Sequence, residues 1–156
     1  MSPAAPEARL KELGLQLPDA PKPLASYVPF VRTGDLVYVS GQVPIRGGQV
    51  THVGKVGAEV DVEAAQEAAA VCAKNALAVL RQAAGGSLDN VVRIVKITGF
   101  VAAAKGFTDI PLVVNGASDL LFEVFGEAGR HARAAVGAAE LPLGVPVEIE
   151  LIAQVR

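Results

Sequence analysis

The last segment of the chain constrains the fold more than any other. From Val147 to Val155 an apolar residue stands at every odd-numbered position, and the intervening positions are Glu148, Glu150, Ile152 and Gln154. A period of two is the signature of a β-strand, whose successive side chains point to opposite faces of a sheet. We therefore predict that the chain ends in a strand with one fully apolar face.

Two further strands are predicted near the start of the domain. Residues 27–31 and 36–40 are rich in β-branched and aromatic side chains, and Thr33-Gly34-Asp35 separates them. Such a pattern is typical of a β-hairpin. A second turn is predicted at Gly47-Gly48, followed by a short strand at 50–53.

The middle of the chain predicts a long helix. Asp61 is a suitable cap, Glu63 lies in the first turn where the helix dipole favours negative charge, and Gly85-Gly86 ends the helix. A second helix is predicted from Ile110 or Asn115 to Phe125. The apolar positions of the first helix recur with the helical period, at Ala65, Ala68, Ala69, Cys72, Ala76, Val79, Leu80 and Ala83.

The remaining segments complete a sheet. Residues 91–101 carry apolar side chains on both faces, typical of a central strand, and residues 133–140 form another strand-like run. This order of elements predicts an α+β sandwich with one mixed β-sheet and two helices packed on one face. Residues 26–156 form this domain. Residues 1–25 precede it as a proline-rich arm with a short helix, expected to pack on the outside of the domain and to contribute little to catalysis.

Composition disfavours several classes of function. Of the 156 residues, 51% are hydrophobic and 19% charged, and the net charge is −2, so the surface is not built to neutralise phosphates or anionic lipids. No run approaches the roughly 18 apolar residues of a membrane span, and the first residues lack the apolar centre of a signal peptide. With Cys72 as the single cysteine, the sequence favours a cytoplasmic protein that binds neither nucleic acid nor membrane.

Arg133, Glu148 and Glu150 are the residues most suggestive of chemistry. The planar fork of an arginine matches a carboxylate two bonds at a time, and an ionised glutamate can steer or deprotonate a water. Together they suggest a site that holds a small carboxylic acid and performs acid–base chemistry on it. On residue types alone, a surface arginine and two solvated strand glutamates are the commoner outcome.

Three motifs are informative in combination. They are Val37-Tyr-Val-Ser-Gly-Gln-Val-Pro44, the helical Lys74-Asn75-Ala76-Leu77, and an ending that runs from Arg133 through Leu141-Pro142 to Val147-Glu-Ile-Glu150. Over residues 26–156 the chain thereby resembles the RidA/YjgF family of reactive-intermediate deaminases. The block Asn115–Asp119 and the overall length are similar to longer members, which carry an N-terminal extension.

The resemblance implies a chorismate-mutase-like fold that assembles as a homotrimer, with sites in clefts between neighbouring subunits. It also implies hydrolysis of 2-imino acids, or their enamine tautomers, to 2-oxo acids and ammonia, with no cofactor or metal. The apolar composition is consistent with such an assembly, because oligomer interfaces bury apolar surface.

Carried over by position, the resemblance assigns roles to individual residues. Arg133 matches the arginine that binds the substrate carboxylate, and Glu148 matches the glutamate that positions the attacking water. The residues that match the substrate-binding lining are Tyr27, Ser40, Gly41, Asn115 and Ala135.

The two residues after Arg133 depart from the family pattern. Ala134 and Ala135 stand where well-known members carry a hydroxyl and often a thiol. The family holds its water partly through a backbone carbonyl at the second of these positions, and Ala135 retains that carbonyl. The resemblance therefore implies altered substrate preference rather than a dead site.

Cys72, His52 and His131 have ordinary structural explanations. Cys72 lies on the apolar stripe of the long helix and is expected in the core. His131 stands between two arginines and is expected to be solvated, and His52 lies in a Gly-flanked loop without an evident partner. With so few candidate ligands, no metal site is predicted.

Three functions remain open. The first is hydrolysis of reactive imino acids. The second is a trimer whose clefts bind small carboxylates without turnover, which release of ammonia from an imino acid would distinguish from the first. The third is an endoribonuclease or translation inhibitor, a label given to some family members, which the acidic net charge disfavours.

Overall fold

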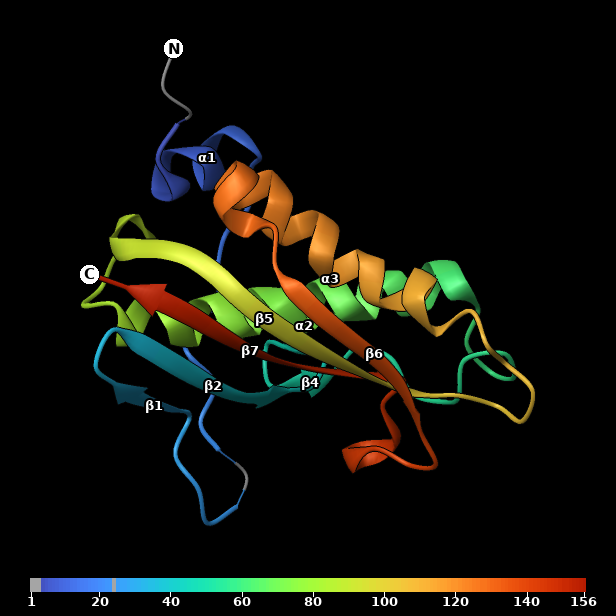
Figure 1. The fold of residues 1–156 in the computed structure, drawn as a ribbon. Coiled ribbons are helices and arrows are strands. Elements are labelled where there is room, and N and C mark those ends of the chain that lie inside the picture. Colours follow the sequence, from blue (N-terminus) through green and yellow to red (C-terminus); the bar gives the residue numbers. More distant parts are fainter. Residues whose placement is uncertain (1–3, 24) are drawn as a thin grey trace.

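The computed structural model of the chain describes residues 4–23 and 25–156 and shows an α+β sandwich, the predicted fold class (Figure 1). The helices are α1 (Pro6–Glu12), α2 (Val62–Ala83) and α3 (Ile110–Phe125), with 3-10 turns η1 (Leu88–Asn90), η2 (Gly126–Gly129) and η3 (Pro142–Gly144). The strands are β1 (Phe30–Thr33), β2 (Leu36–Gln42), β3 (Ile45–Arg46), β4 (Gln49–Val50), β5 (Val91–Ala102), β6 (Ala132–Ala138) and β7 (Val147–Val155).

The main sheet has the strand order β1-β2-β7-β5-β6. Neighbouring strands run antiparallel except β5 and β6, which are parallel, so the sheet is mixed as predicted. Strand β5 pairs on both sides, which confirms that it is central. Strands β3 and β4 flank the turn at Gly47-Gly48 and form a separate two-stranded sheet, so the strand predicted at 50–53 ends at Val50 and does not join the main sheet.

Strand β1 begins later than the sequence predicted. It starts at Phe30 rather than at Tyr27, because Pro29 has no N–H to contribute to a strand ladder. The hairpin turn lies at the predicted place, where Thr33 pairs with Leu36. Tyr27 therefore lies in the loop before the sheet rather than on a strand.

Helices α2 and α3 pack on one face of the main sheet, as predicted (Figure 1). Helix α2 starts after Asp61, whose carboxylate accepts a hydrogen bond of 2.8 Å from the N–H of Ala64. It ends at Ala83, and Gly85 follows with a φ of 83°, a conformation that glycine adopts without strain. Helix α3 starts at Ile110, the earlier of the two predicted starts.

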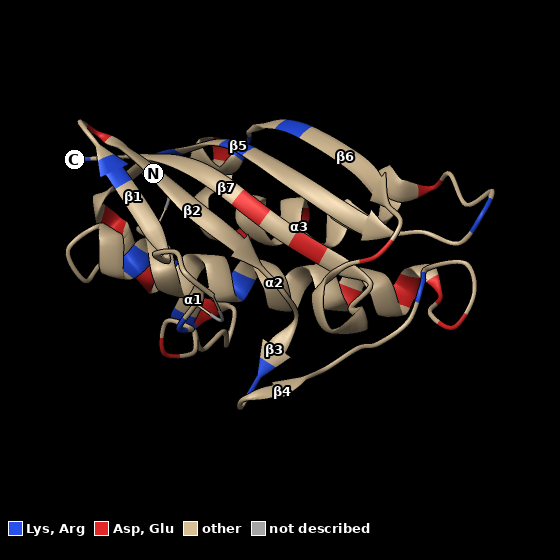
Figure 2. Ribbon diagram, turned by 90° about the horizontal axis from the view of Figure 1, so that it is seen from below, with Lys and Arg blue, Asp and Glu red and all other residues tan. Residues whose placement is uncertain are grey.

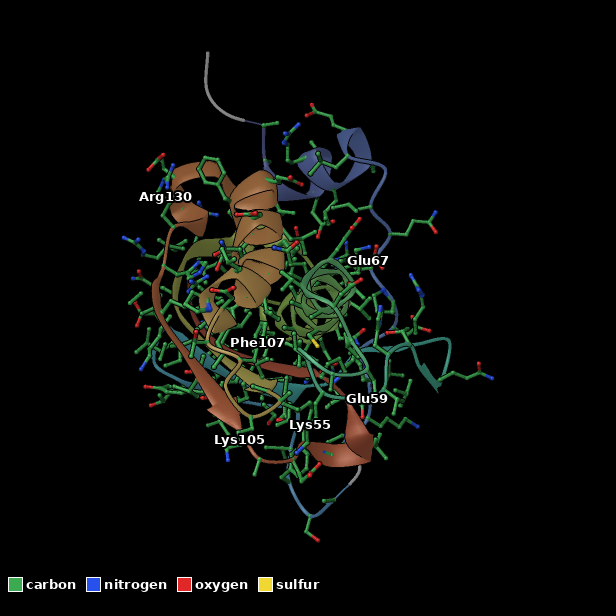
Figure 3. The ribbon with its side chains drawn as sticks, turned by 90° about the vertical axis from the view of Figure 1, so that its right-hand side faces the viewer. Lys55, Glu59, Glu67, Lys105, Phe107 and Arg130 are labelled. Carbon is green, nitrogen blue, oxygen red and sulfur yellow. The ribbon has the colours of Figure 1, made fainter. Side chains whose placement is uncertain are left out.

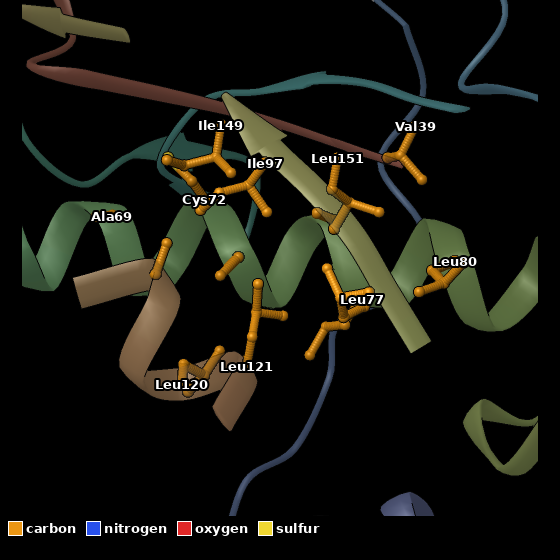
Figure 4. Packing of buried hydrophobic residues seen from close by; sticks show 14 of the residues in the cluster. Val39, Ala69, Cys72, Leu77, Leu80, Ile97, Leu120, Leu121, Ile149 and Leu151 are labelled. Carbon is orange, nitrogen blue, oxygen red and sulfur yellow. The ribbon is translucent and has the colours of Figure 1, made fainter. Parts of the chain in front are cut away.

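The core lies between these two helices and the central strands (Figure 4). Ile97 of β5 and Ile149 and Leu151 of β7 point toward α2, where Cys72 and Leu77 lie. The odd-numbered residues of β7 are all buried, which confirms the period of two. Cys72 is fully buried in this cluster, as predicted.

The opposite face of the main sheet is not covered by any helix of the described residues (Figure 2). Strand periodicity places Tyr38, Val136 and Ile152 on this open face, and Tyr38 and Val136 are each 44% exposed. Glu148 and Glu150, the acidic residues of β7, lie on the same face and appear as two red bands in Figure 2. Exposed apolar side chains on an uncovered sheet face are available for contact with another molecule.

The arm is fixed to the domain through α1, which packs against α3 and η1. Leu10 is 2% exposed and joins the core. The carboxylate of Glu7 accepts two bonds from the guanidinium of Arg81, at 2.9 and 2.8 Å, and one of 2.9 Å from the N–H of Leu88. Residues 1–3 and 24 of the predicted arm lie outside the described residues.

Candidate functional site

Glu148 and Gly41 are in direct contact. The register between β2 and β7 shifts between Val39 and Gln42, so β2 is irregular at its Ser-Gly pair. A Cβ atom built on Gly41 would lie 2.6 Å from Oε2 of Glu148 and 3.0 Å from its Cδ. The carboxylate of Glu148 therefore rests on the bare backbone of Gly41, which gives a physical reason for the glycine of the Ser-Gly-Gln motif.

A cavity of about 580 Å³ opens beside this pair, a size that suits a small molecule. Four of the predicted site residues line it together, namely Tyr27, Ser40, Gly41 and Glu148. Residues 21–23 of the arm form another part of its wall, so the arm is not confined to the outside of the domain as expected. Much of the remaining wall is apolar.

Ser40 is tied to the loop that precedes β1. Its hydroxyl donates to the carbonyl of Val28 at 2.7 Å, and its N–H donates to the carbonyl of Pro29 at 2.9 Å. These bonds hold the loop against β2, and Tyr27 of this loop, which is 50% exposed, lines the cavity. In the structure, Ser40 therefore helps to hold the loop that carries Tyr27.

Asn75 is a lining residue that the candidate set did not include. It is 2% exposed on the core side of α2, and its Nδ2 donates to the carbonyls of Val43 at 3.1 Å and Ile45 at 2.9 Å. These bonds fix the segment after β2, which forms a further wall of the cavity. A buried side-chain amide needs hydrogen-bond partners. An asparagine among the alanines of the predicted helix could therefore have indicated that Asn75 holds a neighbouring segment.

The surroundings of Glu148 in this cavity change the pKa of its carboxyl. Burial raises its pKa above the ordinary 4.5, and the charge of Glu150 raises it further. A carboxyl with a raised pKa can both accept and donate a proton closer to neutral pH. Cys72 lies nearby, but burial and the charge of Glu148 raise the pKa of its thiol, which favours a core residue over a nucleophile.

Arg133 lies on β6 and reaches toward α3. Its Nη1 donates to Oδ1 of Asn115 at 2.7 Å and to Oγ of Ser118 at 3.2 Å, and its Nη2 lies 3.4 Å from the carbonyl of Pro111. Asn115 and Arg133, two of the predicted site residues, are thus in contact. Ala135 lies two residues further along β6 and so faces the same side of the sheet.

One copy of the chain keeps Arg133 and Glu148 apart. Arg133 pairs with Ile97, which pairs with Leu151, so its side chain is on the helix-covered face. Glu148 pairs with Phe100 and is on the open face, and β5 separates the two strands. The predicted residues therefore form two groups, one around Glu148 and one around Arg133, in separate pockets.

Both histidines have partners that the sequence did not indicate. The prediction that His131 is solvated is wrong, because the ring is half-buried and bonds to Ser118 at 2.9 Å and to the carbonyl of Gly129 at 2.7 Å. His52 also has a partner, since its Nδ1 lies 2.7 Å from the hydroxyl of Thr51. Each histidine thus contacts a hydroxyl, but only that of His131, on Ser118, also contacts Arg133.

Within residues 4–23 and 25–156, no group of three or more His, Cys, Asp or Glu side chains is arranged to hold a metal ion. None of the helices in that same part of the chain combines the length and apolarity that crossing a membrane requires.

Comparison with known proteins places this fold and these motifs in a family. The family model described as "YjgF/chorismate mutase-like, putative endoribonuclease" matches residues 7–155. Protein TCP17 of Trypanosoma cruzi is 45% identical over 152 residues, which cover 96% of this chain and 93% of that protein. A Dermatophagoides farinae protein named 2-iminobutanoate/2-iminopropanoate deaminase is 33% identical over 138 residues, covering 88% and 92%.

Solved structures agree. The crystal structure of Atu1372 from Agrobacterium tumefaciens, a protein described as having unknown function, matches with a TM-score of 0.91 and 49% identity, covering 97% of this chain and 93% of that one. The chain therefore belongs to the YjgF/chorismate mutase-like family, which confirms the resemblance to RidA/YjgF proteins.

Proposed function

We propose that the protein hydrolyses reactive 2-imino acids, or their enamine tautomers, to 2-oxo acids and ammonia. The observation that carries the proposal is Glu148, whose carboxyl has a raised pKa and rests on Gly41 in a largely apolar cavity. That is the setting a group needs in order to pass a proton between water and a leaving amine. The family relative named an imino-acid deaminase supports the reaction class.

Arg133 supplies the group that would bind the substrate carboxylate. A guanidinium has five N–H donors, and the described contacts occupy both on Nη1 and one on Nη2. The Nε–H takes no part in these contacts, and Nε and Nη2 lie along one edge of the group. A carboxylate binds such an edge through two parallel hydrogen bonds.

The complete site joins Arg133 of one copy to Glu148 of a neighbour in a homotrimer. Two observations support this arrangement: one chain holds the two residues on opposite faces of its sheet, and the open face carries exposed apolar side chains such as Tyr38 and Val136. Light scattering should give a mass about three times the 16.0 kDa of the chain. A mass equal to that of one chain would contradict the assembly.

The reaction then needs few groups. Arg133 holds the substrate carboxylate, and Glu148 as a carboxylate takes a proton from water while the water oxygen bonds to the imine carbon. The C=N π electrons move to nitrogen, which receives the proton from Glu148. The hydroxyl of the resulting carbinolamine then gives up its proton to nitrogen, its electron pair forms C=O, and the C–N bond breaks. One water is consumed, one ammonia leaves, and Glu148 returns to its starting state.

Substitution of Arg133 tests this proposal. Arg133→Lys should fail nearly as badly as Arg133→Ala, with about a hundredfold fall in kcat/KM, because an ammonium cannot reproduce the two-bond fork. The assay generates 2-imino acids with an amino-acid oxidase and follows their conversion to 2-oxo acids. The control is Lys105→Ala, which also removes one positive charge, since Lys105 is exposed in the loop between β5 and α3 and lines neither pocket (Figure 3). Parent-like turnover by Arg133→Ala would contradict the assignment.

The two other functions make different predictions in the same experiments. A carboxylate-binding trimer would bind 2-oxo acids through Arg133 without releasing ammonia from imino acids. An endoribonuclease would cleave RNA and bind it in a salt-dependent manner, which the net charge of −2 disfavours.

A further inference from the structure

A chain of hydrogen bonds links Arg133 to His131 through Ser118. The Nδ1 atom of His131 lies 2.7 Å from the carbonyl of Gly129, and its Nε2 lies 2.9 Å from Oγ of Ser118. The same Oγ accepts a bond of 3.2 Å from Nη1 of Arg133. These hydrogen bonds connect three elements: α3, η2 and the start of β6.

The chemistry of each group fixes the direction of every bond. The carbonyl of Gly129 can only accept, so Nδ1 of His131 carries a hydrogen. In a neutral imidazole Nε2 is then an acceptor, and the hydroxyl of Ser118 must donate to it. That leaves a lone pair of Ser118 facing Arg133, which can only donate. Every donor therefore has an acceptor, provided that His131 is neutral.

The surroundings favour the neutral ring. Burial lowers the pKa of His131 below its ordinary 6.5, the carbonyl of Gly129 acts in the opposite direction, and the charge of Arg133 lowers it further. The charged side chains that share this pocket are Asp119 of α3, Arg130 and Arg133.

The other charged groups near this pocket are engaged elsewhere. Glu127 of η2 is paired with Arg130. Arg93 of β5 donates to the backbone carbonyl of Arg130 at 2.8 Å.

We propose that Ser118 and His131 are positioning residues that hold the Arg133 guanidinium ready for a substrate carboxylate while His131 is neutral. The inference deepens the proposed function and rests on it for the identity of the ligand. Protonation would make Nε2 of His131 a donor, and one hydroxyl oxygen would then accept from two cationic groups. Arg133 would lose its fixed orientation, so carboxylate binding should weaken in acid.

Binding of pyruvate to the full chain, measured by calorimetry, tests whether Ser118 and His131 position Arg133, and it does not require turnover. Between about pH 5 and 8, the parent should bind well at neutral pH and lose about tenfold in affinity as the pH falls through the lowered pKa of His131. His131→Asn cannot gain this proton and should lose less affinity in acid. His52→Gln removes the imidazole–hydroxyl contact with Thr51 and should behave like the parent.

Variants of Ser118 separate positioning from folding. Ser118→Ala removes one partner of Nη1 and should raise KM and the Kd for pyruvate about tenfold with kcat within a few-fold of the parent. Ser118→Thr keeps the hydroxyl and should restore both values. Unchanged pyruvate affinity in Ser118→Ala, or equal acidic loss in His131→Asn and the parent, would overturn the proposal.

The same measurements distinguish this inference from the proposed function. Absence of imino-acid hydrolysis, with pyruvate binding that follows the expected pattern, would refute the reaction and leave the positioning of Arg133 intact. Imino-acid hydrolysis together with pyruvate affinity that is unchanged by the Ser118 and His131 variants would support the reaction and refute the positioning of Arg133. NMR provides an independent check, since His131 should carry its hydrogen on Nδ1 at neutral pH.

Discussion

Gly41→Ala should damage the reaction while leaving the fold almost unchanged. The new Cβ would lie 2.6 Å from Oε2 of Glu148, and ordinary contact begins at 3.4 Å, so the carboxylate must move by about 0.8 Å. A misplacement approaching 1 Å can lower a rate by about a hundredfold. The group displaced is the end of a flexible side chain, so we expect a strain of about 1 kcal/mol or less. Alanine also lowers the conformational entropy of the unfolded chain relative to glycine, which should offset about half of this strain energy.

The assay is the hydrolysis of imino acids generated in situ, compared in two backgrounds. In the parent, Gly41→Ala should lower kcat/KM between about tenfold and a hundredfold with little change in the thermal midpoint. In Glu148→Ala there is no carboxylate to displace, and the same substitution should have almost no further effect. An undiminished rate in the parent, or an equal loss in both backgrounds, would refute the reasoning.

Further predictions concern stability and the arm. Glu148→Gln should lower kcat/KM about a hundredfold yet raise the thermal midpoint at pH 7, because ionising a carboxyl whose pKa is raised by folding costs stability. That gain should disappear below about pH 4.5, where Glu148 is protonated in both states, and its absence at pH 7 would contradict the raised pKa. Glu7→Gln should cost about 1–2 kcal/mol in urea unfolding at pH 7. Burial alone would raise the pKa of Glu7, but bonds from Arg81 and the Leu88 amide outweigh it, so the difference should vanish as the pH falls below 4.5. Deleting residues 1–24 should lower the thermal midpoint, because Leu10 leaves the core and Arg81 loses Glu7. The folded protein should hydrolyse the smallest imino acids within a few-fold of the parent and change more on bulky ones, which kinetics on a substrate series at a temperature well below the midpoint would check.

Elements with local signals could be predicted from the sequence. The period of two in β7, the Asp61 cap of α2 and the turn before Leu36 each depend on neighbours in the chain, and the structure confirms all three. The start of β1 was missed because the aromatic run at Tyr27 outweighed Pro29, which has no N–H to donate.

The arrangement of the candidate site could be predicted only in part. The motif Ser-Gly-Gln indicated that Gly41 matters, but its contact with Glu148 depends on the register between β2 and β7, which no local pattern encodes. The setting of His131 was predicted wrongly because its sequence neighbours are arginines. Its partner in space, Ser118, lies 13 residues earlier on another element.

The central claim is that Arg133 of one subunit and Glu148 of another form one site. It can be tested by unfolding and refolding Arg133→Ala and Glu148→Gln together in equal amounts. Each variant alone should be nearly inactive, but random trimers should recover about a quarter of the parental activity, because a site needs an intact residue from each of two chains. If the two residues belonged to one site within a single chain, no mixture could restore it, and activity no greater than that of the separate variants would contradict the account.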